Sequence, residues 1–392
     1  MKTKKKEVSI YIHIPFCERK CLYCDFLSAP AAASERDAYV KALLMEIKKE
    51  AETLQDYVVT TVFIGGGTPS LLTAEQLCSI MEQIKKHFHC AASAEISMEC
   101  NPGTVDLQKL QAFKSAGINR LSIGLQSTDN NTLAVLGRIH TYEQFLATFQ
   151  QAREAGFTNI NIDIMSALPG QDRESNLATL KKVTSLQPEH ISAYSLIIEE
   201  GTPFFTTYGT EENQKALPDE EEERAMYYDT QHHLQAAGYH HYEISNYAKK
   251  GFECRHNLVY WTGKDYVGFG TGAASYFEGV RYHNLTDTKE YCNLFSKNKL
   301  CKQEIDNVLK KDIQVLSEMD KKEEYMFVGL RLLKGVSITD FAQQFGVSME
   351  EEYGFVIQTL IEEKLLYKKG DYLKLSKRGV DISNYVMAQF LH

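Results

Sequence analysis

The sequence predicts an α/β protein made of a partial (β/α)6 barrel and a C-terminal winged-helix-like, α-rich domain. Strand-like and helix-like segments alternate six times between residue 8 and about residue 240. Three helical segments and a short hairpin follow near the C-terminus, and no apolar run approaches the ~20 residues that cross a bilayer. We therefore expect a parallel sheet whose site lies at the carboxyl ends of its strands.

The six barrel strands are expected where short β-branched or apolar runs occur. Between them, apolar residues recur at helical spacing, as in Tyr39, Leu43 and Ile47, and Ser34 and Thr73 are candidate helix caps. Six units fall short of the eight that close a full barrel, so we expect an open one. The predicted strands are Val8–Ile14, Val58–Ile64, Ala94–Glu99, Asn119–Gln126, Thr158–Ile164 and His190–Leu196.

The C-terminal part begins near Lys310 and has the pattern of a winged helix. Winged helices often bind DNA, but the candidate recognition helix carries Glu350, Glu351 and Glu352, so we expect a packing or protein-interaction role and no nucleic-acid partner. The expected domains are 1–240, a Gly- and aromatic-rich extension 241–305, and 306–392. The predicted helices are Glu323–Leu333, Ile338–Phe345 and Met349–Glu363, before a hairpin in Leu365–Leu375.

Composition narrows the class of protein. The 392 residues include 43 Lys+Arg and 52 Asp+Glu, a net charge of −9, which argues against a nucleic-acid binder that depends on its overall field. The basic start MKTKKKEVSI lacks the apolar region and cleavage site of a signal peptide. Nine cysteines without a secretory signal indicate a reducing, cytoplasmic location, where clustered thiols are typical of metal ligands.

Three of the cysteines, Cys17, Cys21 and Cys24, follow the first predicted strand directly. Thiolates at this spacing can hold three irons of a [4Fe–4S] cluster and leave the fourth iron without a protein ligand. An open metal position suits a reactive site, because a structural site is normally closed. The alternative, a zinc site, would normally need a second C-x-x-C pair or histidines at ligand spacing, and neither occurs near these cysteines.

Further polar residues lie at the ends of later strands. The second strand ends in Gly65–Ser70, where consecutive glycines let the backbone approach a ligand closely. Glu99, Gln126, Arg138 and Asp163 end or follow the third, fourth and fifth strands. Each alone could be a cap or a salt-bridge partner, but their joint occurrence favours a zwitterionic ligand that carries a ribose.

The cysteine motif resembles the signature of the radical S-adenosylmethionine (SAM) superfamily, and this resemblance implies that SAM chelates the open iron. A sharper resemblance is to the oxygen-independent coproporphyrinogen III oxidase family, and it covers essentially the whole chain. It is carried by Tyr11–Cys17, Gly65–Ser70, Asn119–Gln126, Asn161–Asp163 and Leu168–Gly170, together with the C-terminal module. The family's SAM contacts would fall on Tyr11, Gly66 and Glu99, and those of a second SAM on Tyr23, Gly67, Thr68, Gln126, Arg138 and Asp163; whether one or two SAM molecules bind stays open.

Two departures separate the chain from the oxidase itself. Phe26 stands where the oxidase has a further cysteine, and only sixteen residues precede Cys17, which removes most of the oxidase's N-terminal extension. His256–Trp261 forms an H-N-x-x-Y-W motif with the only tryptophan of the chain. These features resemble the HemW branch of the family, whose members are regarded as heme chaperones.

The resemblance to this branch implies heme b as a third cofactor. A neutral imidazole is a common axial ligand of heme iron, so His256 is the candidate ligand. Alternatively, His256 only orients its loop, and His13, His140 or His283 ligates the iron.

Three functions follow from these resemblances. The first is a heme chaperone that binds a [4Fe–4S] cluster, SAM and heme b and delivers heme to apo-hemoproteins such as respiratory-chain cytochromes. The second is an oxygen-independent coproporphyrinogen III dehydrogenase, which would use a SAM-derived radical in an oxidative decarboxylation. The third is a heme-degrading methyltransferase. The first is favoured; whether the protein is an enzyme stays open, as does a homodimer, and membrane association would be at most peripheral.

Overall fold

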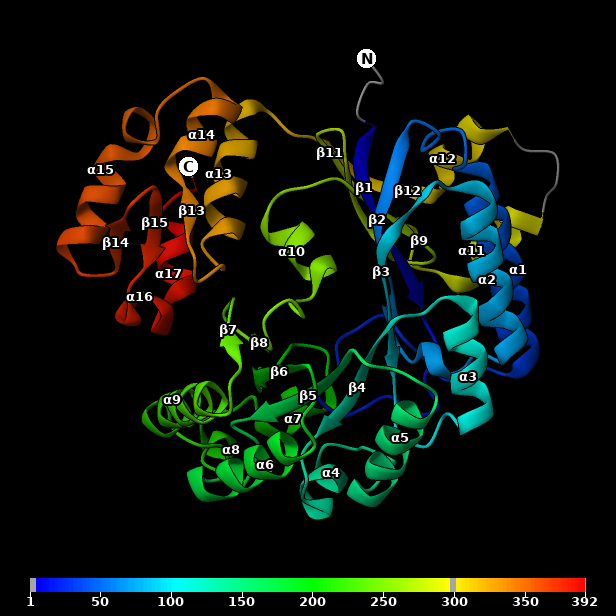
Figure 1. Ribbon diagram of the computed structural model, residues 1–392, viewed down its shortest axis with the longest axis horizontal. Helices are drawn as coiled ribbons and strands as arrows, with labels where there is room; N and C mark the ends of the chain where they lie inside the picture. The colour runs from blue at the N-terminus through cyan, green and yellow to red at the C-terminus, as the bar shows by residue number, and fades with distance from the viewer. Residues whose placement is uncertain (1–4, 297–300, 392) are drawn as a thin grey trace.

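The computed structural model describes residues 5–296 and 301–391, and its centre is a sheet of six parallel strands (Figure 1). All six strands predicted from the sequence are present, with ends that differ by four residues at most. The predicted α/β class is therefore confirmed. The strands are β1 (Lys6–Ile14), β2 (Tyr57–Gly66), β3 (Cys90–Cys100), β4 (Arg120–Gln126), β5 (Ile160–Ser166) and β6 (His190–Ser195).

The crossover helices cover the outer face of this sheet (Figure 1). Ile10, Ile12 and Ile14 of β1 are fully buried, as expected for parallel strands. Thr73 caps its helix as predicted by accepting a hydrogen bond from the Gln76 amide, whereas the first helix begins one residue before the predicted Ser34 cap. The helices are α1 (Ala33–Lys49), η1 (Pro69–Leu71), α2 (Ala74–His87), α3 (Leu107–Ala116), α4 (Asn130–Val135), α5 (Tyr142–Glu154), α6 (Arg173–Ser185), α7 (Pro203–Tyr208), α8 (Glu211–Gln214) and α9 (Glu220–Ala236).

Residues 240–315 extend the same sheet at both of its edges. At one edge, β8 (Asn246–Ala248) and β7 (His240–His241) continue from β6 in antiparallel pairing. At the other edge, β9 (Tyr266–Phe269) pairs in parallel with β1, so Ser9 lies opposite Tyr266. Antiparallel strands then complete the twelve-stranded sheet. They are β10 (Ala274–Phe277), β11 (Val280–Asn284) and β12 (Lys310–Val315), and the helices of this region are α10 (Arg255–Trp261), α11 (Thr288–Ser296) and α12 (Lys302–Leu309).

The C-terminal domain has a core of its own and lies beside α10 (Figure 1). The three predicted helices and the predicted hairpin are present, and a short third strand, which the sequence did not predict, joins the hairpin. The guanidinium of Arg331 lies 4.4 Å from the ring centroid of Trp261, which joins this domain to α10. The elements are α13 (Glu318–Gly329), β13 (Val336–Ser337), α14 (Ile338–Phe345), α15 (Met349–Glu362), β14 (Leu366–Lys369), β15 (Tyr372–Leu375), α16 (Lys377–Asp381) and α17 (Ser383–Ala388).

Within residues 5–296 and 301–391, none of the helices combines the length and the apolar character needed to span a bilayer.

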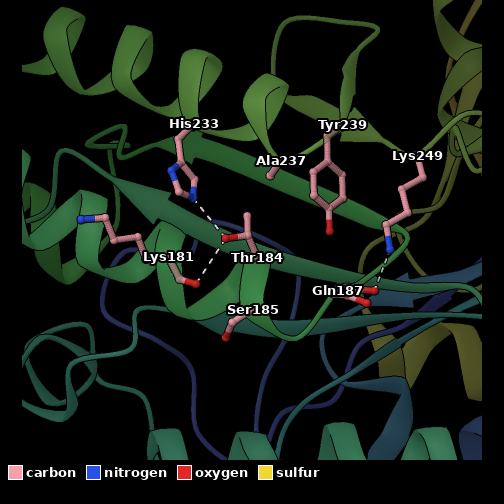
Figure 2. A pocket seen from close by; sticks show the side chains of 8 residues that line it. All are labelled: Lys181, Thr184, Ser185, Gln187, His233, Ala237, Tyr239 and Lys249. Carbon is pink, nitrogen blue, oxygen red and sulfur yellow. Dashed lines mark hydrogen bonds between the residues drawn. The ribbon is translucent and has the colours of Figure 1, made fainter.

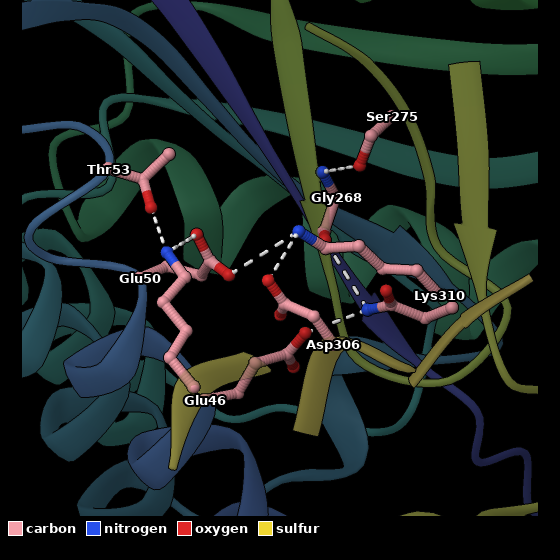
Figure 3. A network of polar contacts seen from close by, with 9 residues as sticks. Glu46, Glu50, Thr53, Gly268, Ser275, Asp306 and Lys310 are labelled. Carbon is pink, nitrogen blue, oxygen red and sulfur yellow. Dashed lines mark hydrogen bonds and ion pairs between the residues drawn. The ribbon is translucent and has the colours of Figure 1, made fainter. Parts of the chain in front are cut away.

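A buried network of polar contacts connects α1 to the edge of the sheet that β9 to β11 form (Figure 3). The carboxylate of Glu46 accepts hydrogen bonds from the Gly270 amide at 2.8 Å, the Asn284 side chain at 2.7 Å and the Tyr291 hydroxyl at 2.5 Å. Directly after α1, Glu50 forms ion pairs with Lys302 of α12 and Lys310 of β12. Burial nevertheless raises the pKa of Glu46 to about 7, because the three donors only partly replace the lost water.

This pKa predicts a pH-dependent stability. The folded protein holds the Glu46 proton more tightly than the unfolded chain does. The contribution of this protonation to the free energy of unfolding is therefore fully present below pH 4.5 and is lost as pH rises through 7. We expect Glu46 to lower the free energy of unfolding by roughly 3 kcal/mol across that window. Urea unfolding followed by the fluorescence of Trp261 measures it, and Glu46→Gln should flatten this part of the slope. An unchanged slope in that variant would contradict the prediction.

Candidate functional site

One cavity of about 460 Å³ opens at the carboxyl ends of the barrel strands, and it is lined by all thirteen residues predicted to bind the cluster, SAM or heme, although not by the three alternative histidines. The residues come from β1 and the loop after it, from the ends of β2 to β5, from the segment between α4 and α5, and from α10. The topology explains the convergence, because parallel strands end at the same edge of a sheet. The thirteen residues are Tyr11, Cys17, Cys21, Tyr23, Cys24, Gly66, Gly67, Thr68, Glu99, Gln126, Arg138, Asp163 and His256.

The three cysteines share one loop, and each is a partly buried free thiol. The Cys24 amide donates to the Cys21 carbonyl, so the loop turns back on itself between these two residues. Burial raises the pKa of the Cys24 thiol, as expected before a metal binds. In the part of the chain that the structure describes, no three acidic, histidine or cysteine side chains lie close enough together to hold a single metal ion. This arrangement is compatible with a cluster, in which each thiolate binds a different iron.

The glycine-rich loop after β2 packs directly against the cysteine loop. The Gly67 and Thr68 amides donate to the carbonyls of Ile14 and Phe16, at 2.9 and 2.7 Å. A Cβ added at Gly67 would lie only 2.6 Å from the Phe16 oxygen, so no larger residue fits there. Gly66 has φ of +111°, a conformation that favours glycine. The Thr68 hydroxyl lies 3.5 Å from the Cys17 sulfur.

Glu99 is a buried acid on the cavity wall. Its carboxylate accepts a hydrogen bond from the Gly66 amide at 3.0 Å. Burial and the neighbouring Asp163 raise the pKa of Glu99 to about 8, against which the Gly66 amide acts only partly. Asp163 accepts hydrogen bonds from Ser122 and Asn161, at 2.9 and 2.7 Å. Two acids therefore face the cavity, and a cationic ligand would stabilise their ionised forms.

Arg138 connects the cysteine loop to the strand ends. Its guanidinium donates to the Asn101 side chain at 2.9 Å and to the Gly124 carbonyl at 2.8 Å, and it lies 3.5 Å from the Cys21 sulfur. Asn101 also donates to Thr68 at 2.8 Å, so it joins both loops. Asn101 was not predicted as a site residue, although its position directly after β3 could have indicated it.

Gln126 and the aromatic residues complete the mouth of the cavity. Gln126 ends β4 with φ of +70°, which turns the chain out of the sheet. Tyr23 packs beside Phe204, with ring centroids 6.3 Å apart. Phe26 also lines the cavity, and its side chain is 61% exposed. An apolar ring therefore lines the same cavity as the three cysteines.

His256 lies deep in the cavity wall and is 1% exposed. Its Nδ1 is 2.7 Å from the Thr61 hydroxyl, and its Nε2 is 2.9 Å from the Tyr260 hydroxyl. Phe63 stacks on the ring, with centroids 5.2 Å apart. Burial and the nearby Arg120 lower the pKa of His256 to about 3, so the imidazole is neutral. It has the protonation state of a metal ligand, but both nitrogens already have partners.

The other candidate histidines differ in their surroundings. Both ring nitrogens of His13 and of His283 are engaged in hydrogen bonds. His140 is buried, and its Nε2 has no hydrogen-bond partner among the described residues. None of these three lines the main cavity.

A second pocket, of about 450 Å³, lies outside the barrel where α6 and α9 end (Figure 2). Its polar groups largely satisfy one another: His233 is 3.1 Å from Thr184, and Lys249 donates to the Gln187 carbonyl at 2.9 Å. Two helix C-termini at this pocket disfavour an anion, so we assign no site to it.

A six-stranded parallel barrel with three cysteines after its first strand and a glycine-rich loop after its second defines a radical SAM protein. Comparison with family models agrees: the radical SAM superfamily matches residues 11–183, and the HemN C-terminal domain matches residues 316–382.

Within that class, the chain belongs to the HemW family. It is 36% identical to heme chaperone HemW of Lactococcus lactis subsp. lactis, with 99% of this chain and 98% of the relative covered. It is 36% identical to the Bacillus subtilis HemW, with 98% and 99% covered, and 34% identical to that of Escherichia coli, with 99% of each covered. The solved structure of E. coli coproporphyrinogen III oxidase (HemN) shares the fold, with a TM-score of 0.82, 23% identity, and 99% of this chain and 90% of that chain covered.

Proposed function

We propose that this protein is a heme chaperone of the radical SAM type, which binds heme b and delivers it to apo-hemoproteins such as respiratory-chain cytochromes. The convergence of all thirteen candidate residues on one cavity carries this proposal. The relatives of similar length, which are named heme chaperones, support it. The cofactors would be a [4Fe–4S] cluster on Cys17, Cys21 and Cys24, and SAM beside it.

The residues of the chain have separate roles in this proposal. When bound and reduced, the cluster supplies an electron that can cleave SAM. Gly66 and Gly67 would place backbone groups beside the methionine end of SAM, and their lack of side chains lets this loop pack closely against His13 and Phe16. Arg138 fixes Cys21 and offers positive charge beside the thiolates. Glu99 meets the cationic part of SAM.

The pKa of Glu99 makes SAM binding pH-dependent. Below pH 8 the free protein holds Glu99 mostly protonated, and a cationic ligand must displace that proton. SAM affinity should therefore rise with pH up to about 8, with a limiting slope of about tenfold per pH unit. Equilibrium binding under anaerobic conditions between pH 6 and 8.5 measures this, with Glu99→Gln as the variant that should show no such slope. A flat profile in unaltered protein would refute the assignment.

A second candidate function is oxygen-independent coproporphyrinogen III oxidation, which the same SAM-facing residues favour. Phe26 favours the chaperone over the oxidase. Its exposed phenyl ring offers neither a thiol nor a titratable proton to a substrate at the mouth of the cavity. Anaerobic incubation with reductant, SAM and coproporphyrinogen, followed by porphyrin analysis, separates the two functions. We expect no decarboxylated product; turnover to protoporphyrinogen would establish the enzyme instead.

His256 is the proposed axial ligand of heme iron, and ligation requires the Tyr260 hydroxyl to release Nε2. We expect about one heme per chain, and His256→Ala should shift the Soret band and weaken binding at least ~10-fold. Tyr260→Phe frees Nε2 and should preserve the Soret band with equal or tighter binding. An unchanged spectrum and affinity in His256→Ala would leave His256 with the orienting role alone, and absence of heme binding in unaltered protein would reject the chaperone function.

A further inference from the structure

Arg120 is a buried cation that has no hydrogen-bonding partner among the residues that the structure describes. It begins β4, is 2% exposed, and is among the largest fully buried side chains of the described residues. Its guanidinium forms no hydrogen bond or ion pair with any residue in 5–296 or 301–391, and its Nε is buried without an acceptor. A guanidinium has five N–H donors, so leaving it buried and unpaired is costly.

The nearby acids are occupied by other donors. Glu95 accepts hydrogen bonds from the amides of Arg255 and His256, at 3.0 and 3.1 Å. Asp163 is held by Ser122 and Asn161. Burial alone would lower the pKa of Arg120, but neighbouring groups, Cys254 and Glu95 foremost, raise it, so the side chain stays charged.

Arg120 lines the same cavity as the cysteines, but from its far end. It is the first residue of β4, and Gln126 at the mouth is the last, so their Cα atoms are about 20 Å apart at the usual rise per residue. Ser122 and Gly124 lie between them on the cavity wall. The guanidinium therefore faces the inner end of a cavity that a ligand enters from the cluster side.

We propose that Arg120 binds a carboxylate of the ligand that enters the barrel. Guanidinium pairs with planar anions through two parallel hydrogen bonds, and buried pairs of this kind are the strong ones. The proposal rests on the proposed function for its two sources of carboxylate, a heme propionate and the methionine carboxylate of a second SAM. A SAM on the cluster would have its methionine end at Gly66 and Gly67, so its own carboxylate would not reach Arg120 at the far end of the cavity. The proposal assigns to Arg120 a role that the SAM-contact pattern of the family does not include.

The test is a set of double-mutant cycles between Arg120 and the ligand's carboxylate, on the full chain with its cluster reconstituted. Heme is compared with its dimethyl ester, and SAM with decarboxylated SAM, on unaltered protein, Arg120→Met and Arg120→Lys. Arg173→Met is the matched control, because Arg173 pairs with Asp229 on the surface. We expect either heme or SAM to bind Arg120→Met at least ~10-fold more weakly than unaltered protein. The corresponding ligand without a free carboxylate, heme dimethyl ester or decarboxylated SAM, should bind both proteins equally. The ligand whose affinity depends on both Arg120 and its own carboxylate is the source of the carboxylate.

Arg120→Lys is the alternative variant if Arg120→Met does not fold. It keeps the positive charge but cannot form two parallel hydrogen bonds, so its affinity for the ligand should fall less than that of Arg120→Met. Acetate provides a test that needs neither heme nor SAM. It should raise the midpoint temperature of thermal unfolding of unaltered protein, relative to chloride at equal ionic strength. It should not change the midpoint of Arg120→Met. If unaltered protein binds neither heme nor SAM, the proposed function fails and the acetate test still decides the role of Arg120. Equal binding of all ligands to unaltered protein and Arg120 variants, without an acetate effect, would mean that only water solvates Arg120 and would overturn the inference.

Discussion

Protein in which Cys17, Cys21 and Cys24 are replaced by alanine should leave anaerobic reconstitution without iron or sulfide. Unaltered protein should bind about four of each, and its cluster spectrum should change on addition of SAM. The expected loss is complete, because each thiolate would hold one iron and no other group of ligands lies nearby in the described chain. Iron and sulfide analysis with absorption and electron paramagnetic resonance spectra measures it.

The control for this loss is Cys78→Ala on α2, a partly buried thiol that is absent from the cavity lining. This variant should keep the full cluster. A cluster retained in the triple variant would refute the assignment of the three cysteines.

Gly67→Ala should produce the second large effect. Its Cβ would lie 2.6 Å from the carbonyl oxygen and 2.9 Å from the nitrogen of Phe16, so the backbone beside Cys17 has to move. Overpacking of this kind typically costs 1–3 kcal/mol, and here the displaced element is the cysteine loop. We expect lower cluster occupancy and SAM affinity reduced about tenfold or more.

Gly354→Ala is the matched control, because the atom nearest to its new Cβ is 3.5 Å away and the residue lies within α15. It should bind SAM normally and be as stable as unaltered protein or more so. Normal SAM binding by Gly67→Ala would show that the glycine loop does not hold the cysteine loop in place.

The barrel was predictable because its strands are encoded locally. Each parallel strand is a short apolar run such as Val58–Ile64, and the cysteine spacing lies within a single loop, so neither depends on distant residues. The position of Glu99 and Asp163 in one cavity also followed from the rule that parallel strands end at the same edge.

Features that depend on tertiary partners were not predictable in this way. Strands β7 and β13 have two residues each and carry no periodicity to detect. The surroundings of His256 are set by Thr61, which lies far away in the sequence. Arg120 lies in Asn119–Gln126, which carries part of the family resemblance, but that no described residue pairs with it becomes visible only when the packing of its neighbours is known.

The pairing of β1 with β9 has a consequence for how the chain is made. The first strand of the barrel lies inside the sheet, between β2 and a strand that is synthesised much later. Until Tyr266–Phe269 have left the ribosome, one edge of β1 has unpaired amides and carbonyls directly beside the cysteine loop. Contacts between residues so distant in sequence close late and slow folding. During synthesis there is therefore a period in which Cys17, Cys21 and Cys24 are already translated but one edge of the strand before them is still unpaired.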